Sequence, residues 1–230
     1  MLKFFNIVRN YRFNSFPLYI LDLIGFHFPS FRCLFSSGRI LKPFYLKDGT
    51  VFLIRPFTYD RVVIDEVFIH KAYNPRGFEI EEGDVVVDLG AHIGAFTLFA
   101  ARKAGVVLSY EPEPENFAIL KENVKANGLI GKVKIFKRAV WSERGFFPLH
   151  SDHNGSHIAS LTNRGVKSVL VKTVTLKDIF TENKLEHIDF LKVDVEGAEL
   201  QIFKSTKANI LTAIKKIAVE CHSPLLKKTS

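Results

Sequence analysis

The chain has 230 residues, 47% of them hydrophobic and 24% charged, which is enough for the full core of one domain with or without an N-terminal extension. Its two cysteines, Cys33 and Cys221, lie far apart without a metal-type spacing. This excludes a disulfide framework and indicates a reducing compartment, so we expect a cytoplasmic protein. The net charge of +8 is spread along the chain. It is explained equally well by binding to an anionic partner and by a need for solubility.

The first 43 residues are predicted to be an aromatic-rich helical extension, and residues 44–230 to be the main domain. The most apolar stretch, residues 18–26, is interrupted by Asp22 and is shorter than the roughly 20 apolar residues of a membrane span, so we predict no transmembrane span. No signal-peptide cleavage pattern follows it. The extension would pack on the main domain or on a partner, including a second copy in a homo-oligomer, with peripheral membrane contact as the alternative.

A hairpin over residues 44–55 opens the main domain, since two strand-like runs flank Asp48-Gly49. Residues 59–73 have the apolar spacing of an amphipathic helix. The loop that follows leads to the first core strand.

Residues 82–98 read as strand, glycine loop and helix, the first half of a βαβ unit. Asp88 closes the strand, and Gly90 and Gly94 form the loop. A dinucleotide site reads Gly-x-Gly-x-x-Gly, whereas this pattern is one glycine short and carries an acid. An acid there repels phosphate and attracts the cationic amino group of an amino-acid-like ligand. The alternative is an ordinary βα turn.

A second strand over residues 106–110 ends at Glu111, roughly 20 residues past the glycine loop, where a carboxylate grips ribose hydroxyls. Alone, Glu111 would read as a solvated loop acid. A helix follows from residue 113 to Gly128, and then a third strand over residues 132–140. Trp141 after it flanks an adenine site or simply packs in the core.

Two further strands, residues 145–149 and 168–173, flank a polar loop at 151–157 that is either an active-site loop or a hairpin tip. A short helix is predicted to begin near residue 174. Residues 188–193 then form a buried-type strand broken by Lys192 and followed by two acids. The fifth strand, residues 214–219, also ends in an acid, beside a histidine. Such groups are costly at buried strand ends unless they are used.

Five segments together resemble the FkbM family of S-adenosylmethionine-dependent methyltransferases. They are Asp-Leu-Gly-Ala-His-Ile-Gly (88–94), Tyr-Glu-Pro-Glu-Pro-Glu-Asn-Phe (110–117), Thr-Leu-Lys-Asp-Ile (175–179), Leu-Lys-Val-Asp-Val-Glu-Gly-Ala-Glu (191–199) and Val-Glu-Cys-His (219–222). The segment at 191–199 discriminates best, since the glycine loop is shared more widely. The family usually has Asn where His92 stands.

The resemblance implies an α/β fold of the Rossmann-like methyltransferase type, with a mostly parallel sheet, helices on both faces and a cofactor-binding core over residues 82–222. Members of this fold continue through another helix and a closing antiparallel hairpin, which do not follow Glu220 here. We therefore expect a sheet without its C-terminal strands, in a truncated or degenerate chain.

The resemblance also implies transfer of a methyl group from S-adenosylmethionine to a hydroxyl of a small molecule or sugar, by in-line displacement. Asp88 and Gly90 would bind the methionine part and Glu111 the ribose. The expected cofactor-binding set is Asp88, Gly90, Ala91, His92, Gly94, Glu111, Pro112, Asn116, Ala139, Val140 and Asp194.

The expected catalytic set is Asp194, Glu196 and His222, with Glu196 or His222 as general base and Glu220 orienting it. A divalent metal on Asp194, Glu196 and His222 is conceivable. Acids that only orient the substrate or cap a helix are the preferred interpretation, so no metal is predicted.

Two other functions fit parts of the pattern. The positive charge and the helix at 118–127 favour an RNA methyltransferase, but no Asn-Pro-Pro-Tyr-type strand end accompanies them. A catalytically inactive protein that binds the cofactor or acts as a scaffold is the other alternative.

Overall fold

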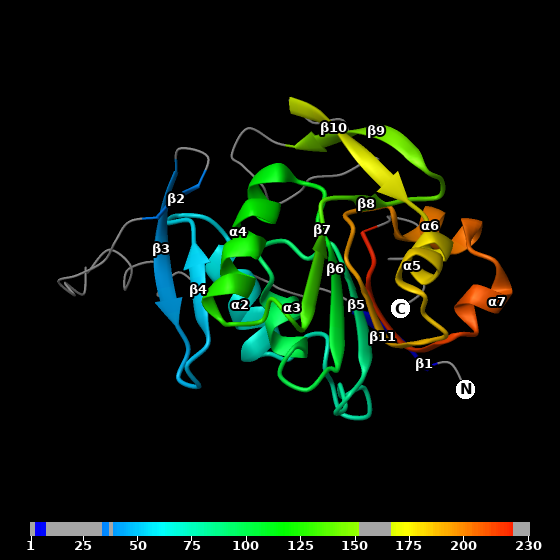
Figure 1. The fold of residues 1–230 in the computed structure, drawn as a ribbon, viewed down its shortest axis with the longest axis horizontal. Helices are drawn as coiled ribbons and strands as arrows, with labels where there is room; N and C mark the ends of the chain where they lie inside the picture. Colours follow the sequence, from blue (N-terminus) through cyan, green and yellow to red (C-terminus); the bar gives the residue numbers. More distant parts are fainter. Residues whose placement is uncertain (1–2, 8–33, 37–38, 152–166, 223–230) are drawn as a thin grey trace.

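The computed structural model describes residues 3–7, 34–36, 39–151 and 167–222. A six-stranded sheet forms its centre, with strand order β1-β12-β11-β5-β6-β7 and every neighbouring pair parallel (Figure 1). In that order, the strands are Lys3–Ile7, Ile214–Glu220, Ile188–Val193, Val85–Leu89, Val106–Tyr110 and Val133–Phe136. All carboxyl ends of these strands therefore point to the same edge of the sheet.

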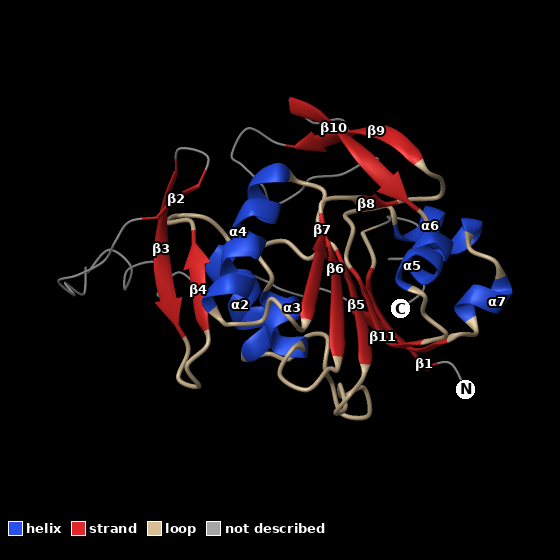
Figure 2. Cartoon of the chain, viewed as in Figure 1, coloured by secondary structure: helices blue, strands red, loops and turns tan. Residues whose placement is uncertain are grey.

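Helices cover both faces of this sheet (Figure 2), because successive strand residues point to opposite sides. Val86 and Phe190 belong to one core, and Val87 and Leu191 belong to the other. The first core packs under α2 (Asp60–Phe68), α3 (Ala95–Ala100) and α4 (Pro114–Ala126). The second packs under α5 (Leu176–Asn183), α6 (Glu199–Ser205) and α7 (Ala208–Leu211). The expected α/β fold with a mostly parallel sheet is confirmed.

Two small sheets flank the main one. The first holds β2 (Leu34–Ser36), β3 (Arg39–Tyr45) and β4 (Val51–Ile54). The hairpin predicted over residues 44–55 is present between β3 and β4, and its first strand begins earlier, at Arg39. Its turn is fixed by Asp48, whose Oδ1 accepts from the N–H of Thr50 at 3.0 Å. Packing of β4 against α4 fixes the hairpin to the main domain.

The second small sheet has the order β8-β10-β9, with β8 at Ala139–Val140, β9 at Gly145–Ser151 and β10 at Lys167–Val174. The third strand predicted over residues 132–140 is therefore two strands in two sheets. The carbonyl of Phe136 accepts from the N–H groups of Glu111 and Arg138, at 3.1 and 2.9 Å, which turns the chain away from the main sheet. The polar loop after Ser151 lies outside the described residues.

The helical prediction for the N-terminal extension is wrong wherever the extension is described: residues 3–7 form β1 alongside β12, residues 34–36 form β2, and residues 39–43 belong to β3. The outer edge of β12 would otherwise present unpaired backbone groups, so the pairing satisfies them. Residues 8–33, which include the apolar stretch and many of the phenylalanines, lie outside the described residues. Within the described ranges, no helix has both the length and the apolar character needed to cross a membrane.

Candidate active site

Charged side chains gather where neighbouring strands of the main sheet end. Asp88 is the penultimate residue of β5, Glu111 and Asp194 directly follow β6 and β11, and Glu220 is the last residue of β12. Backbone hydrogen bonds join these strand ends, because the N–H of Asp194 donates to the carbonyl of Leu89 at 3.1 Å. The parallel topology thus brings together residues that lie more than a hundred positions apart in the chain.

The glycine loop after β5 crosses the end of β11 at very close range. A Cβ on Gly90 would lie 1.8 Å from the carbonyl oxygen of Asp194, and its φ is +77°. A Cβ on Gly94, at φ +95°, would lie 2.6 Å from Cδ1 of Leu120. Both positions therefore need glycine for the packing of the chain on itself, before any ligand is considered.

Asp88 lies under this loop rather than on its surface. Its side chain is fully buried, accepts from the hydroxyl of Thr97 at 2.7 Å, and lies 3.2 Å from Nζ of Lys192. The same ammonium donates to the carbonyl of Gly90 at 2.7 Å and lies 3.5 Å from Oδ2 of Asp194. Burial opposes the charge of Lys192, but Asp88 and Asp194 raise its pKa above the ordinary lysine value. Asp88 thus acts on the site through Lys192.

Glu111 is buried against the other side of the loop. Its carboxylate accepts from the N–H of His92 at 2.7 Å and from the N–H of Glu113 at 2.9 Å. Burial raises the pKa of Glu111 to about 7, although these two N–H groups and the charge of Lys192 oppose the shift. A carboxylate can accept about four hydrogen bonds. Two N–H contacts therefore leave acceptor capacity for hydroxyl groups of a ligand.

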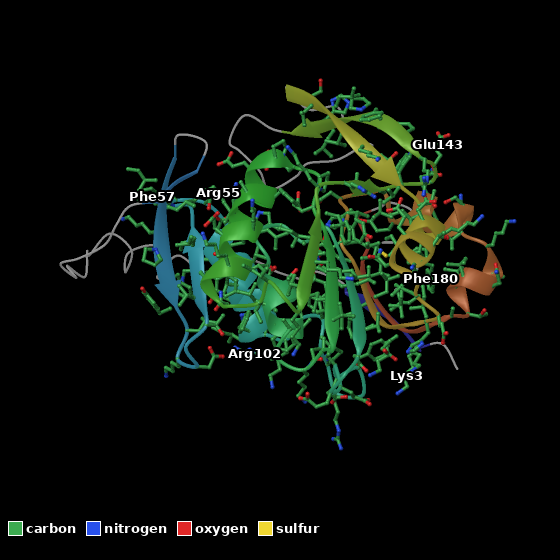
Figure 3. All side chains as sticks on the ribbon, viewed as in Figure 1. Lys3, Arg55, Phe57, Arg102, Glu143 and Phe180 are labelled. Carbon is green, nitrogen blue, oxygen red and sulfur yellow. The ribbon has the colours of Figure 1, made fainter. Side chains whose placement is uncertain are left out.

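A buried ion pair holds the loop from the side of α2 and α4 (Figure 3 labels Arg55). The guanidinium of Arg55 contacts Asp60 at 2.6 Å, donates to Oδ1 of Asn116 at 2.9 Å, and lies 3.4 Å from Nε2 of His92. His92 has a left-handed backbone, with φ +53°. The predicted cofactor residues Asn116 and His92 therefore share this cluster, and Asn116 uses its side-chain oxygen within it.

Four carboxylates surround His222. Its Nδ1 lies 2.9 Å from Oε1 of Glu199, while its Nε2 lies 3.3 Å from Glu196, 3.4 Å from Glu220 and 3.8 Å from Asp194. Burial opposes a charge on this ring, but hydrogen bonds to Glu199 and Glu220 and the charges of Glu196 and Asp194 raise the pKa of His222 to about 11. In this arrangement, His222 is an imidazolium ion at neutral pH.

Tyr73 belongs to the site, although the sequence does not predict it there. Its hydroxyl lies 2.9 Å from Oδ2 of Asp194 and 3.0 Å from Oε2 of Glu220, and its ring faces the ammonium of Lys192 at 5.2 Å. The residue comes from the loop after α2, and nothing in its local sequence marks it. Glu199 lies within the 191–199 segment, but only the fold shows its contact with His222.

The remaining predicted cofactor residues lie around this centre. Ala91 is buried in the glycine loop, and its N–H donates to the carbonyl of Tyr110 at 3.1 Å. Pro112 follows Glu111 and is partly exposed. Ala139 and Val140 are buried in β8, and Trp141 beyond them packs against the second core. These contacts are structural; adenine binding at β8 stays a prediction.

Residues 88–228 match the family model described as "Methyltransferase FkbM domain". The chain is 29% identical over 191 residues to the 31-O-demethyl-FK506 methyltransferase FkbM of Streptomyces tacrolimicus, covering 68% of this chain and 72% of the relative. It is 30% identical over 146 residues to the hexuronic acid methyltransferase AglP of Haloferax volcanii, covering 63% of this chain and 59% of the relative.

A crystal structure of methyltransferase FkbM from Methylobacillus flagellatus KT aligns with a TM-score of 0.43 and 16% identity, over 62% of this chain. This chain spans about a third of that protein's length, since the alignment covers 32% of it.

Proposed function

The chain belongs to the FkbM methyltransferase family, and we propose that it transfers the methyl group of S-adenosylmethionine to a hydroxyl group of a small polyhydroxylated molecule. The observation that carries this proposal is the convergence of Asp194, Glu196, Glu220 and His222 directly beside the glycine loop. Two relatives support the acceptor class, since their names specify 31-O-demethyl-FK506 and hexuronic acid.

The residues around the glycine loop fit S-adenosylmethionine by the chemistry of their donor set. Glu111 is an acceptor for ribose hydroxyls, and Asp194 supplies a negative charge for a cationic ligand. The cofactor supplies an electrophilic methyl group on a positively charged sulfur. Asp88 contributes indirectly, because its charge holds Lys192 against the carbonyl of Gly90.

Glu196 is our candidate for the general base. Its side chain is 24% exposed, against 18% for Asp194 and 4% for Glu220, so an acceptor hydroxyl reaches it most readily. His222 as an imidazolium has no lone pair with which to take a proton. The sequence left Glu196 and His222 open as bases, and the surroundings of the ring favour Glu196. Its backbone is left-handed, with φ +53°, a conformation that often marks functional positions.

Methyl transfer can be followed by mass spectrometry with S-adenosylmethionine and a panel of sugar acids, neutral sugars and hydroxylated natural products. We expect S-adenosylhomocysteine and one singly methylated acceptor. Glu196→Gln should lower the rate by about 100-fold or more if this carboxylate is the base. Glu186→Gln is the matched control, because Glu186 is exposed and precedes β11 at the opposite end of the strand. Methylation of RNA alone would overturn the acceptor class.

Cofactor binding is tested separately by calorimetry with S-adenosylhomocysteine. Glu111→Gln should weaken it by about tenfold, the cost of roughly one charge-assisted hydrogen bond. Glu122→Gln on α4 should not change it. Equal affinities in both variants would remove Glu111 from the cofactor site.

We place the protein in the cytoplasm on the cysteine usage alone.

A further inference from the structure

Three side chains of the candidate site present ligand atoms to one common point. Asp194, Glu220 and His222 each offer one atom, and these atoms all lie within 4.8 Å of one another. Nε2 of His222 lies 3.4 Å from Oε1 of Glu220 and 3.8 Å from Oδ1 of Asp194. Two ligands bonded to the same small divalent ion lie about 3 to 4 Å apart, given bonds of about 2.1 Å. The two separations from Nε2 of His222 therefore fall within the range found in a coordination shell.

Neighbouring side chains hold these three ligand residues in place. The imidazole is held through its other nitrogen, Nδ1, by the buried carboxylate of Glu199 at 2.9 Å. Metal-binding histidines usually have such a carboxylate on the far nitrogen. The outer oxygens of the two acids, Asp194 Oδ2 and Glu220 Oε2, face the hydroxyl of Tyr73, which leaves the inner oxygens toward the imidazole.

The cluster also carries an excess of negative charge. Glu199 is 2% exposed, and its Oε2 has no hydrogen-bond partner among the described residues. Around the ring, four carboxylates face one imidazole, and Lys192, the nearby ammonium, is shared with Asp88. Two of the four carboxylates, Glu199 and Glu220, are buried, and the four outnumber the positive charges of the protonated ring and Lys192, so the cluster favours a further cation.

We propose that Asp194, Glu220 and His222 bind one divalent cation of the Mg²⁺ or Mn²⁺ class, with Glu196 at the partly exposed side of the site. The cation takes the place of the proton on Nε2 of His222, because a histidine ligates a metal only as the neutral imidazole, so the ring is an imidazolium ion only in the metal-free chain. Two carboxylates and one imidazole suit Mn²⁺ and Mg²⁺ better than thiophilic metals. The cation would leave coordination positions for a substrate hydroxyl and lower the pKa of that hydroxyl. The binding of the metal does not depend on methyl transfer, whereas its role toward the hydroxyl rests on the proposed function.

The test uses the full chain, freed of metal with a chelator and titrated with Mn²⁺ in the absence of cofactor. Bound Mn²⁺ loses the sharp electron paramagnetic resonance signal of the free ion. We expect one saturable site per chain, with affinity at least about tenfold lower in Asp194→Asn and in Glu220→Gln. Glu182→Gln, an exposed carboxylate on α5, is the matched control and should bind as the wild type does. Mg²⁺ should compete for the site.

A second measurement uses the wild-type chain alone, so it tests the proposal even if a variant fails to fold. In the ¹⁵N-histidine spectrum of the wild-type chain, Mn²⁺ at low stoichiometry should broaden His222 before the distant exposed His187. The proposal is overturned if the wild type shows no saturable site, if all variants bind equally, or if other histidines broaden first. Methyl transfer that persists in chelator would confirm the proposed function while removing the metal from it.

Discussion

Lys192 and Asp88 are register partners on the adjacent strands β11 and β5, and their charged groups lie 3.2 Å apart with neither side chain exposed beyond 4%. The ammonium continues to the carbonyl of Gly90 and to Asp194, so this pair ties the glycine loop to the acidic end of β11. We infer that it fixes the relative positions of the glycine loop and the acids that follow β11.

Removing the ammonium while keeping its volume should unfold the site. Lys192→Met leaves Asp88 as a buried, unpaired charge, so we expect the free energy of unfolding to fall by about 3 to 5 kcal/mol. The double variant Asp88→Asn/Lys192→Met should recover part of that loss. Urea unfolding measures both. Equal losses in the single and double variants would contradict a direct charge coupling.

Gly90→Ala should be destabilising because of its place against β11. The new methyl group would lie within 1.8 Å of the carbonyl oxygen of Asp194, in a left-handed backbone. Overpacking and the backbone conformation each cost about 1 to 3 kcal/mol. Gly131→Ala is the control, since nothing lies within 4 Å of its Cβ position. Thermal unfolding measures the difference, and equal melting temperatures for the two variants would contradict the prediction.

Breaking the Arg55–Asp60 pair should disturb both stability and cofactor binding. Asp60→Ala leaves the buried guanidinium beside His92 and Asn116 with the weaker contact to Glu115, at 3.7 Å, in place of its close ion pair, so we expect a loss of about 3 to 5 kcal/mol. The more exposed pair Arg138–Glu182 provides the control, and Glu182→Ala should cost about 1 kcal/mol or less. Chemical unfolding checks the difference, and similar losses for both pairs would show that the buried pair is not structural.

Glu111 should make stability depend on pH between about 4.5 and about 7. Its pKa is raised from 4.5 to about 7 by burial, so over this interval the unfolded chain ionises first and the folded chain keeps its proton. The unfolded state therefore binds fewer protons, and stability falls as pH rises. Glu111→Gln removes this contribution. The unfolding free energy of wild type minus variant should decrease from pH 5 to pH 7.5; a constant difference would contradict the raised pKa.

Most strands and helices of the main domain, and the family, could be predicted from local sequence, whereas β1 was predicted to be helical. Short β-branched runs that end in an acid mark β5, β6 and β11, and the glycine loop follows from its spacing. The segment at 191–199 identified the family because it is a contiguous pattern. Such features depend on neighbours within a few residues, so the order of residues determines them.

The composition of the site was decided by tertiary structure. Asp88 is predicted to bind a ligand, and the sheet register adds a contact with Lys192 that the sequence alone does not show. Tyr73 reaches Asp194 and Glu220 from 121 and 147 residues away, and no local pattern encodes that contact. The protonation of His222 depends on four acids that only parallel strand ends and the start of α6 bring together. Charge interactions act between groups that are close in space, so the tertiary structure determines which residues interact in the site.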